Sequence, residues 1–265
     1  MFKTKKTRSE SEDGVRTFAS SDVSRIAQVS LRQLQWWDER KVVSPRHEGH
    51  RRGKDSVRAV VEAARELGIP NLTLFAFSSE NWHRPSTEVS FLMQLFHRYL
   101  VTETKRLMKR DIRVVALGDT ERLPPRVRQA LADTVAATRE NRTMTVALAL
   151  SYGGRQDIVN AAKAIARAVA DGELSPDDVD EQTVAHELTT TGLPDPDLLI
   201  RTSGELRVSN FFLFQLAYTE LYFTDTLWPD FRERDFLAAL TAYQRRDRRF
   251  GAVTNTADHR LRAQN

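Results

Sequence analysis

The sequence predicts an α/β protein with a parallel sheet flanked by helices, preceded by a small helix-turn-helix unit. From residue 57 onward, short apolar segments alternate with amphipathic segments, a pattern typical of a parallel sheet covered on both faces. Before residue 45, two short helical patterns flank a tight turn. At 265 residues, the chain is long enough for a small domain joined to a larger one.

The N-terminal part divides into a tail and a helical unit. Residues 1–15 are polar, charged and aperiodic, so we expect a disordered basic tail there. Residues 20–22 offer N-cap oxygens before the apolar positions Val23, Ile26 and Ala27. A second helical pattern over residues 31–37 stops before Pro45. We therefore expect a helix-turn-helix within residues 16–52.

The main domain is expected over residues 53–253, followed by a polar tail over 254–265. Its first helix carries apolar residues from Val57 to Leu67 at helical spacing and ends at Gly68-Ile69-Pro70. Strands are predicted at 71–78, 112–119, 143–152, 197–204 and 220–224, and helices at about 86–109, 125–140, 155–171, 180–188 and 231–249.

Composition narrows the classes of protein. The chain has no cysteine, which excludes disulfides and thiolate metal sites and fits a reducing compartment. No apolar run approaches the roughly 20 residues that span a bilayer, and no secretory signal is visible, so we expect a cytoplasmic protein. Basic charge is concentrated at the start: residues 1–54 hold 13 Lys and Arg against 7 Asp and Glu, whereas the remainder holds 27 against 29. Such a segment suits phosphate backbones or is a solvated tail.

Polar residues follow three of the predicted strands, at residues 78–84, 153–155 and 201–210. Because the carboxyl ends of parallel strands meet at one edge, these residues are expected to lie close together. Arginine forks with nearby hydroxyl groups suit a diphosphate. Glu205 and Glu220 would then bind Mg²⁺ or orient the arginines. The alternative is that Arg201 and Glu205 only pair at a surface turn.

An apolar face on the helix at 86–109 has two interpretations. It would pack in the core, or it would line a tunnel for a long apolar product, and periodicity does not separate these uses. Its members are Phe91, Leu92, Leu95, Phe96 and Leu100. No P-loop, dinucleotide-binding or HExxH motif is present.

From about Arg46 to Val253 the chain resembles the cis-prenyltransferases of the undecaprenyl diphosphate synthase type. The motifs that carry the resemblance are GHRRG, LTLFAFSSENWHRP, EVSFLM, GDTERLP, ALSYGGRQDIV, YQRRDRRFG and the long block from Gly192 to Phe231. The resemblance implies condensation of isopentenyl diphosphate with an allylic diphosphate, with Mg²⁺ as cofactor. It also implies a homodimer, and a lipid product that brings transient membrane contact.

The resemblance implies roles for individual residues. The diphosphate of the isopentenyl donor would be held by Arg201, Arg207 and Ser209. Glu205 would organise these arginines, and Glu220 would bind the metal. The residues beside the allylic substrate would be Ser78, Asn81, Trp82 and Arg84, with Asn81 where condensation and proton loss occur. Arg46 and His50 would lie near the allylic diphosphate, and Arg249 and Gly251 would reach a partner's active site.

One part of the family pattern is absent. Members begin with a strand that ends in a DGNGRW-like loop, whose Asp binds magnesium and whose amides hold the allylic diphosphate. Here Asp13-Gly14 is the nearby Asp-Gly pair, and it lies in a polar segment without a preceding strand. We therefore expect the first strand to be missing and activity to be impaired, because preorganised charge stabilisation contributes several kcal/mol to such steps.

Residues 17–52 resemble the N-terminal winged helix-turn-helix of MerR-type regulators. The residues implied to lie near DNA are Ser30, Arg32, Gln33, Gln35 and Trp36, with Arg51 and Arg52 of the wing on phosphates. The stretch RHEGHRRG belongs to both patterns. Two alternatives to an active enzyme follow: a DNA-binding pseudoenzyme that senses a prenyl diphosphate, or a non-catalytic subunit of a prenyltransferase heteromer.

Overall fold

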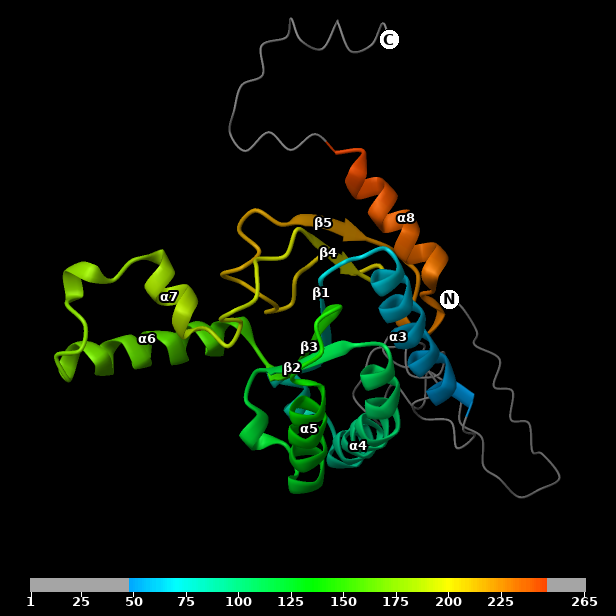
Figure 1. Cartoon of the computed structure of the whole chain (residues 1–265), viewed down its shortest axis with the longest axis horizontal. Helices are drawn as coiled ribbons and strands as arrows, with labels where there is room; N and C mark the ends of the chain where they lie inside the picture. The colour runs from blue at the N-terminus through cyan, green and yellow to red at the C-terminus, as the bar shows by residue number, and fades with distance from the viewer. Residues whose placement is uncertain (1–47, 247–265) are drawn as a thin grey trace, which may run out of the picture.

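A computed structural model describes residues 48–246, with side chains from Gly53 onward (Figure 1). The helices are α3 (Glu48–Glu66), α4 (Ser86–Lys109), α5 (Pro125–Thr138), α6 (Gly154–Ala170), α7 (Glu181–Glu187) and α8 (Glu233–Gln244). The strands are β1 (Asn71–Ser78), β2 (Ile112–Leu117), β3 (Met144–Tyr152), β4 (Leu198–Arg201) and β5 (Glu220–Phe223). Short 3-10 turns lie at Ser79–His83, Thr120–Arg122, Pro176–Asp178 and Trp228–Asp230. The predicted order of strands and helices from residue 57 to 246 is confirmed.

The strands form two parallel sheets within the described residues. β3 lies between β1 and β2 in a three-stranded sheet, and β4 pairs with β5 in a second sheet. The sequence pattern predicted one parallel sheet, so this is a difference. Its physical reason is that no strand within residues 48–246 bridges the facing edges of β1 and β4.

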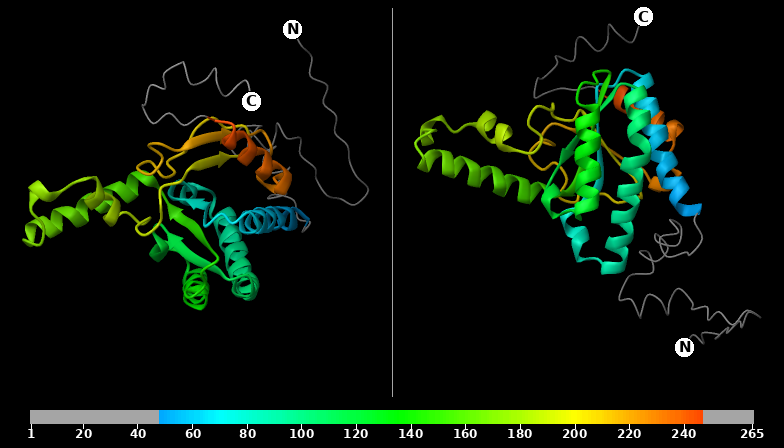
Figure 2. Two further views of the ribbon diagram at one scale, coloured as in Figure 1. Left: turned by 45° about the horizontal axis from the view of Figure 1, so that its top comes forward. Right: turned by 60° about the horizontal axis from the view of Figure 1, so that its bottom comes forward.

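β3 is the centre of the larger sheet. Its nine residues are almost all buried, which agrees with its continuous apolar sequence. Buried side chains of β1, β2 and β3 pack with those of α3, α4 and α5 in the main core, which includes Phe77, Val114 and Leu131. α4 and α5 pack on each other and on β2. α6 and α7 pack together in an arm that extends away from the sheets in the views of Figures 1 and 2.

α3 begins at Glu48, earlier than the pattern predicted. Arg51 and Arg52 therefore lie in a helix and not in the extended wing expected around them, and the helix runs through residue 52, where the domain boundary was expected. The physical reason is a set of ion pairs between α3 and α4. Glu103 on α4 holds Lys54 (Nζ to Oε1, 2.9 Å) and Arg58 (Nη2 to Oε1, 2.5 Å), which ties the start of α3 to α4.

Three ion pairs also fix the direction of α3. Arg58 pairs with Glu103, and one turn later Glu62 pairs with Arg106 (2.6 Å) and Arg110 (3.4 Å). Residue numbers increase together along both helices, so α3 and α4 run in the same direction. No helix within residues 48–246 is both long enough and apolar enough to cross a membrane.

Candidate functional site

A cavity of about 1870 Å³ lies between the two sheets and is the centre of the candidate site. Its walls come from β1, β3, β4, α3, α4 and the loop that follows β4. The predicted site residues that line it are Arg84, Arg201, Glu205 and Arg207. Four members of the apolar α4 face also line it: Leu92, Leu95, Phe96 and Leu100. One cavity thus combines arginines at the carboxyl end of β4 with an apolar wall.

Arg201 is the last residue of β4, and its Nε is buried without a hydrogen-bond partner among the described residues. Burial lowers the pKa of Arg201, and the positive charge of Arg207 lowers it further, whereas Glu205 acts in the opposite direction. A buried guanidinium with an unused donor is costly unless an anion pairs with it. The site therefore suits a negatively charged ligand.

Glu205 pairs with Arg207, with 2.5 Å between Oε2 and Nη1. The alternative drawn from the sequence, a surface pair between Arg201 and Glu205, is not the ion pair that forms. Arg207 remains largely exposed on the loop after β4, so its other nitrogens can reach a ligand. Glu205 holds Arg207 while Arg201 lines the cavity. A carboxylate placed in this way can orient the guanidinium groups toward a ligand.

The loop after β4 is pinned in an unusual backbone conformation. Ser203, Gly204, Ser209 and Asn210 all have positive φ values, between 52° and 76°. The amides of Ser203 and Gly204 donate to the carbonyls of Thr226 and Thr224 (both 2.9 Å), and a Cβ at Gly204 would collide with Asp225. Ser203 lines the cavity, but the predicted ligand Ser209 does not.

The turn after β1 carries the other predicted catalytic residues. Asn81 Oδ1 accepts a hydrogen bond from the amide of Ser78 (3.0 Å), so its side chain holds this turn. Trp82 Nε1 donates to Ser151 Oγ (2.9 Å), and the guanidinium of Arg122 lies 4.9 Å from the centroid of the Trp82 ring. Ser78, Asn81 and Trp82 lie beside the cavity and do not line it, whereas Arg84 lines it and pairs with Glu88 (2.5 Å).

Two residues without a predicted role join the turn after β1 to the loop after β4. Asn210 Nδ2 donates to Glu80 Oε1 (2.6 Å), while Asn210 Oδ1 accepts from the amide of Arg155 (2.8 Å). Burial acts to raise the pKa of Glu80, but the hydrogen bond from Asn210 and those of its own turn keep the pKa below its usual value. Glu80 and Asn210 both lie within polar segments that follow strands. That position was the sequence signal that could have identified them as site residues.

Glu220, the predicted metal ligand, lies away from the cavity. It opens β5 opposite Leu198, so it stands at the amino end of the small sheet, roughly 10 Å along the strand direction from Arg201. Its Oε2 pairs with Arg246 Nη1 (2.5 Å), and Arg246 also donates to the carbonyl of Leu221 (2.9 Å). Sequence reasoning missed Arg246, because a partner separated by 26 residues leaves no local pattern.

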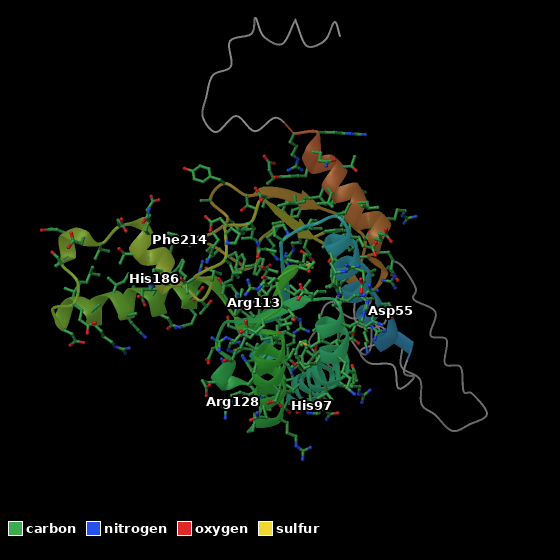
Figure 3. The ribbon with its side chains drawn as sticks, viewed as in Figure 1. Asp55, His97, Arg113, Arg128, His186 and Phe214 are labelled. Carbon is green, nitrogen blue, oxygen red and sulfur yellow. The ribbon has the colours of Figure 1, made fainter. Side chains whose placement is uncertain are left out.

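The residues present agree only in part with a magnesium site. Within residues 48–246, no group of three or more acidic or histidine side chains could hold a metal ion, and His97 and His186 lie far from each other (Figure 3). Magnesium that is shared with a diphosphate needs only one or two carboxylates, however. Glu205 and Asp225 both line the cavity that Arg201 lines, so the donor set fits an ion carried by a phosphate ligand.

Several predicted residues lie outside the described part of the chain. These are Arg46, Arg249 and Gly251 of the expected substrate sites and Ser30, Arg32, Gln33, Gln35 and Trp36 of the expected DNA-binding surface. The tail over 1–15, most of the helix-turn-helix segment and the tail over 254–265 also fall there. His50 is described only as part of the α3 backbone.

The chain is similar to known prenyltransferases over most of its length. A family model described as undecaprenyl diphosphate synthase matches residues 35–251, so the match begins before Arg46, where the resemblance was expected to begin. An isoprenyl transferase of Geobacillus kaustophilus is 50% identical over 218 residues, which cover 82% of this chain and 84% of that protein. A ditrans,polycis-undecaprenyl-diphosphate synthase of Legionella pneumophila, specific for (2E,6E)-farnesyl diphosphate, is 49% identical over 231 residues, covering 87% and 96%.

The fold agrees with that similarity. The crystal structure of lavandulyl diphosphate synthase from Lavandula x intermedia, in complex with dimethylallyl diphosphate, superposes with a TM-score of 0.75 at 40% identity, and covers 88% of this chain and 94% of that one. The chain belongs to the undecaprenyl diphosphate synthase family of prenyltransferases.

Proposed function

We propose that the protein condenses isopentenyl diphosphate with an allylic diphosphate to give a longer polyprenyl diphosphate. The observation that carries the proposal is Arg201: its buried Nε has no partner among the described residues, on the wall of a cavity that also holds an apolar surface. Both substrates have a diphosphate head and an apolar tail. A site with arginines at one end and leucine and phenylalanine side chains on a wall matches both parts of such a molecule.

In the proposed reaction the allylic C–O bond breaks, the diphosphate leaves, a carbon–carbon bond forms to the isopentenyl group, and a proton is lost from that group. Arg201 and Arg207 hold the isopentenyl diphosphate, and Glu205 keeps Arg207 in place through their ion pair. Ser209 would join them after a shift of its loop. Ser78 and Asn81, joined by a hydrogen bond, position the turn beside the reacting carbons together with Trp82, while Arg84 takes the allylic side.

The growing chain needs an apolar path away from the reacting carbons. Leu92, Leu95 and Phe96 on α4 line the cavity, so we propose that they contact the isoprenoid tail. Mg²⁺, when bound, would neutralise charge on the leaving diphosphate. Glu205 and Asp225 are placed to hold it, and Glu220 remains a predicted ligand that would first have to separate from Arg246.

The test is a product assay. Purified protein is incubated with Mg²⁺, isopentenyl diphosphate and farnesyl diphosphate, and chain-lengthened products are measured by mass spectrometry. Because removal of one preorganised charge-stabilising donor costs about 100-fold or more in rate, Arg201→Ala should lose product formation by that factor. Arg113→Ala, which removes an exposed arginine on β2 that does not line the cavity, is the matched control and should retain activity. No product from folded protein would refute the proposal.

The remaining expectations belong to the same proposal. We infer a homodimer, in which Arg249 and Gly251 of one protomer reach the partner's site and Arg46 and His50 lie near the allylic diphosphate. A cytoplasmic location and transient membrane contact through the lipid product also remain predictions. Gel filtration with light scattering would test the dimer.

The DNA-binding alternative is supported only by the basic charge of residues 1–54 and the MerR-like pattern. In that alternative Ser30, Arg32, Gln33, Gln35 and Trp36 meet the duplex and Arg51 and Arg52 meet phosphates, and the protein senses a prenyl diphosphate. Binding that weakens steeply with salt would support it. The alternative of a non-catalytic subunit would require that the chain raises the activity of a complete family member.

A further inference from the structure

Asn210 lies where three segments of the chain meet at the carboxyl ends of the strands. It belongs to the loop after β4, and it bonds both the turn after β1 and the start of α6, which follows β3. Its carbonyl accepts from the amide of Gly154 (2.7 Å), its Oδ1 accepts from the amide of Arg155 (2.8 Å), and its Nδ2 donates to Glu80 Oε1 (2.6 Å). One residue thus connects segments that follow three different strands.

The two bonds to α6 satisfy donors that the helix itself cannot satisfy. The first amides of an α-helix have no partner within the helix, and the residue before α6 is Gly153, which has no side chain to accept from them. Asn210 supplies both acceptors from a distant part of the chain. Its φ of 60° is in the left-handed region, which asparagine adopts more readily than most residues. The start of α6 therefore fixes the position of the loop after β4.

The third bond holds the turn after β1. A carboxylate only accepts hydrogen bonds and the nitrogen of an amide only donates them, so the partners of Asn210 determine how its side chain is oriented. Because Glu80 is an acid, this bond is charge-assisted and stronger than a bond between neutral groups. The two segments also approach closely, since a Cβ on Gly153 would collide with both Ser79 Oγ and Asn210 Nδ2.

The segments that Asn210 connects carry different parts of the proposed site. The loop after β4 carries Arg207 and Ser209, which are proposed for isopentenyl diphosphate. The turn after β1 contains Glu80 and leads directly to Arg84, which is proposed for the allylic side. Both segments lie outside the strands, so their relative position depends on contacts between them. A displacement of about 1 Å between reacting groups can cost on the order of 100-fold in rate.

We propose that Asn210 is a positioning residue that serves both substrates through separate bonds. Its two acceptors hold the loop of the isopentenyl side on α6, and its Nδ2 holds the turn of the allylic side through Glu80. The inference rests on the proposed function. It adds that a change at one residue can loosen the allylic side while the isopentenyl side keeps its anchor.

Asn210→Asp separates the two roles. The variant keeps both acceptors, and a carboxylate at the amino end of a helix is favourable. It loses the donor and places a second negative charge beside Glu80, which repels the turn. The Kd for farnesyl diphosphate should rise about fivefold or more, while that for isopentenyl diphosphate should change by less than about twofold. Isothermal titration calorimetry with Mg²⁺ and one substrate at a time measures both constants without turnover.

A second substitution tests whether the bond itself is responsible. Combined with Asn210→Asp, Glu80→Gln should return the Kd for farnesyl diphosphate to within about twofold of the parent, because the new amide donates to the new carboxylate. Glu80→Gln alone keeps an acceptor for Asn210 and should raise this Kd less than Asn210→Asp does. Asn160→Asp adds the same charge on the exposed face of α6 and is the matched control, which should leave both constants unchanged.

Hydrogen–deuterium exchange examines the turn without any substrate. The peptide over residues 78–85 should exchange faster in Asn210→Asp than in the parent and should recover in the double variant, while the start of α6 keeps its protection. Melting temperatures verify that each variant folds. If neither substrate binds the parent protein, the proposed function fails, and the exchange result still decides the role of Asn210.

Three outcomes would overturn the proposal. Equal weakening of both substrates in Asn210→Asp would show that the residue does not hold the two sides separately. An unchanged affinity for farnesyl diphosphate, or an unchanged exchange of the turn, would show that the bond to Glu80 does not position the allylic side. A double variant as weak as Asn210→Asp would assign the effect to the added charge instead of the lost bond.

Discussion

The two parallel sheets of this protein differ in how completely they are covered. In the larger sheet β3 is buried along almost its whole length, with a partner strand on either side. In the smaller sheet β4 and β5 are four residues long and mostly half-exposed, and Leu221 is 37% exposed. The residues proposed to bind the isopentenyl diphosphate lie at the end of β4 and in the loop after it. The comparison teaches that the central strand of the larger sheet is scaffold, while the proposed chemistry lies where the edge strands β1 and β4 end, beside the cavity.

A matched pair of leucine substitutions, one in each sheet, tests this difference between the sheets. It has the largest expected effect on stability. Leu117 on β2 is 2% exposed and packs in a cluster with Tyr152 and Phe212, whereas Leu199 on β4 is 8% exposed beside the cavity. We expect Leu117→Ala to lower the free energy of unfolding by about 3–4 kcal/mol and Leu199→Ala by about 2 kcal/mol, because a site beside open space has fewer contacts to lose. Urea denaturation measures both. Equal losses would contradict the difference between the sheets.

The attachment of α3 sharpens the comparison, because α3 belongs to the main core and also lines the cavity. The Glu103 side chain is buried and accepts hydrogen bonds from Arg58, and we expect Glu103→Gln to cost about 1.5–3 kcal/mol. Leu100→Met, a volume-conserving change one turn earlier, serves as the control and should cost less.

The Glu103 carboxylate also predicts how the free energy of unfolding changes with pH. Burial acts to raise the pKa of Glu103, but hydrogen bonds from Arg58 and Lys54 hold it below the usual value of 4.5. A carboxyl with a lowered folded-state pKa stabilises the fold above about pH 4.5, and this stabilisation is lost as the pH falls through the folded-state value. Urea titrations from pH 7 to pH 3 should therefore show a shallower fall for Glu103→Gln than for the parent. Parallel curves would remove Glu103 as a cause of acid sensitivity.

The smallest expected effect on stability concerns the contact between the turn after β1 and the loop after β4. Asn210, after β4, bonds Glu80, after β1, and also the amide of Arg155. We expect Asn210→Ala to cost about 1 kcal/mol in stability and to raise the KM for isopentenyl diphosphate more than it lowers kcat, because the loop that holds Arg207 would lose its anchor. Gln156→Ala, which removes an exposed bond on α6, is the control. A fall in kcat alone would instead place Asn210 at the reacting atoms.

Local patterns predicted most of the described fold. The bounds of β1 and α4 were predicted to the residue, because a continuous apolar strand and a long amphipathic helix have strong signals. Residues 48–52 were assigned to the wing of the helix-turn-helix unit by resemblance, and the ion pairs from Glu103 that tie the start of α3 to α4 come from a distant segment. The division into two sheets was not predicted, because strand pairing depends on residues far apart in the chain.

The candidate site was predicted less completely than the fold. Arg201, Glu205 and Arg207 were identified because arginines and a carboxylate that follow a strand suggest anion binding. Glu220 was expected beside them. It is the first residue of β5, whereas Arg201 is the last residue of the parallel strand β4, so the two lie at opposite ends of the strands in the small sheet. The catalytic role of Asn81, which the family resemblance implies, remains a prediction, and in the structure its side chain holds the turn after β1 through the amide of Ser78.

The facing edges of β1 and β4 also bear on how selectively this protein assembles. Backbone donors and acceptors recognise any extended peptide, whatever its side chains, so the edges alone give no sequence preference. Discrimination must come from the apolar walls and from Asp195 and Asp197 at the amino end.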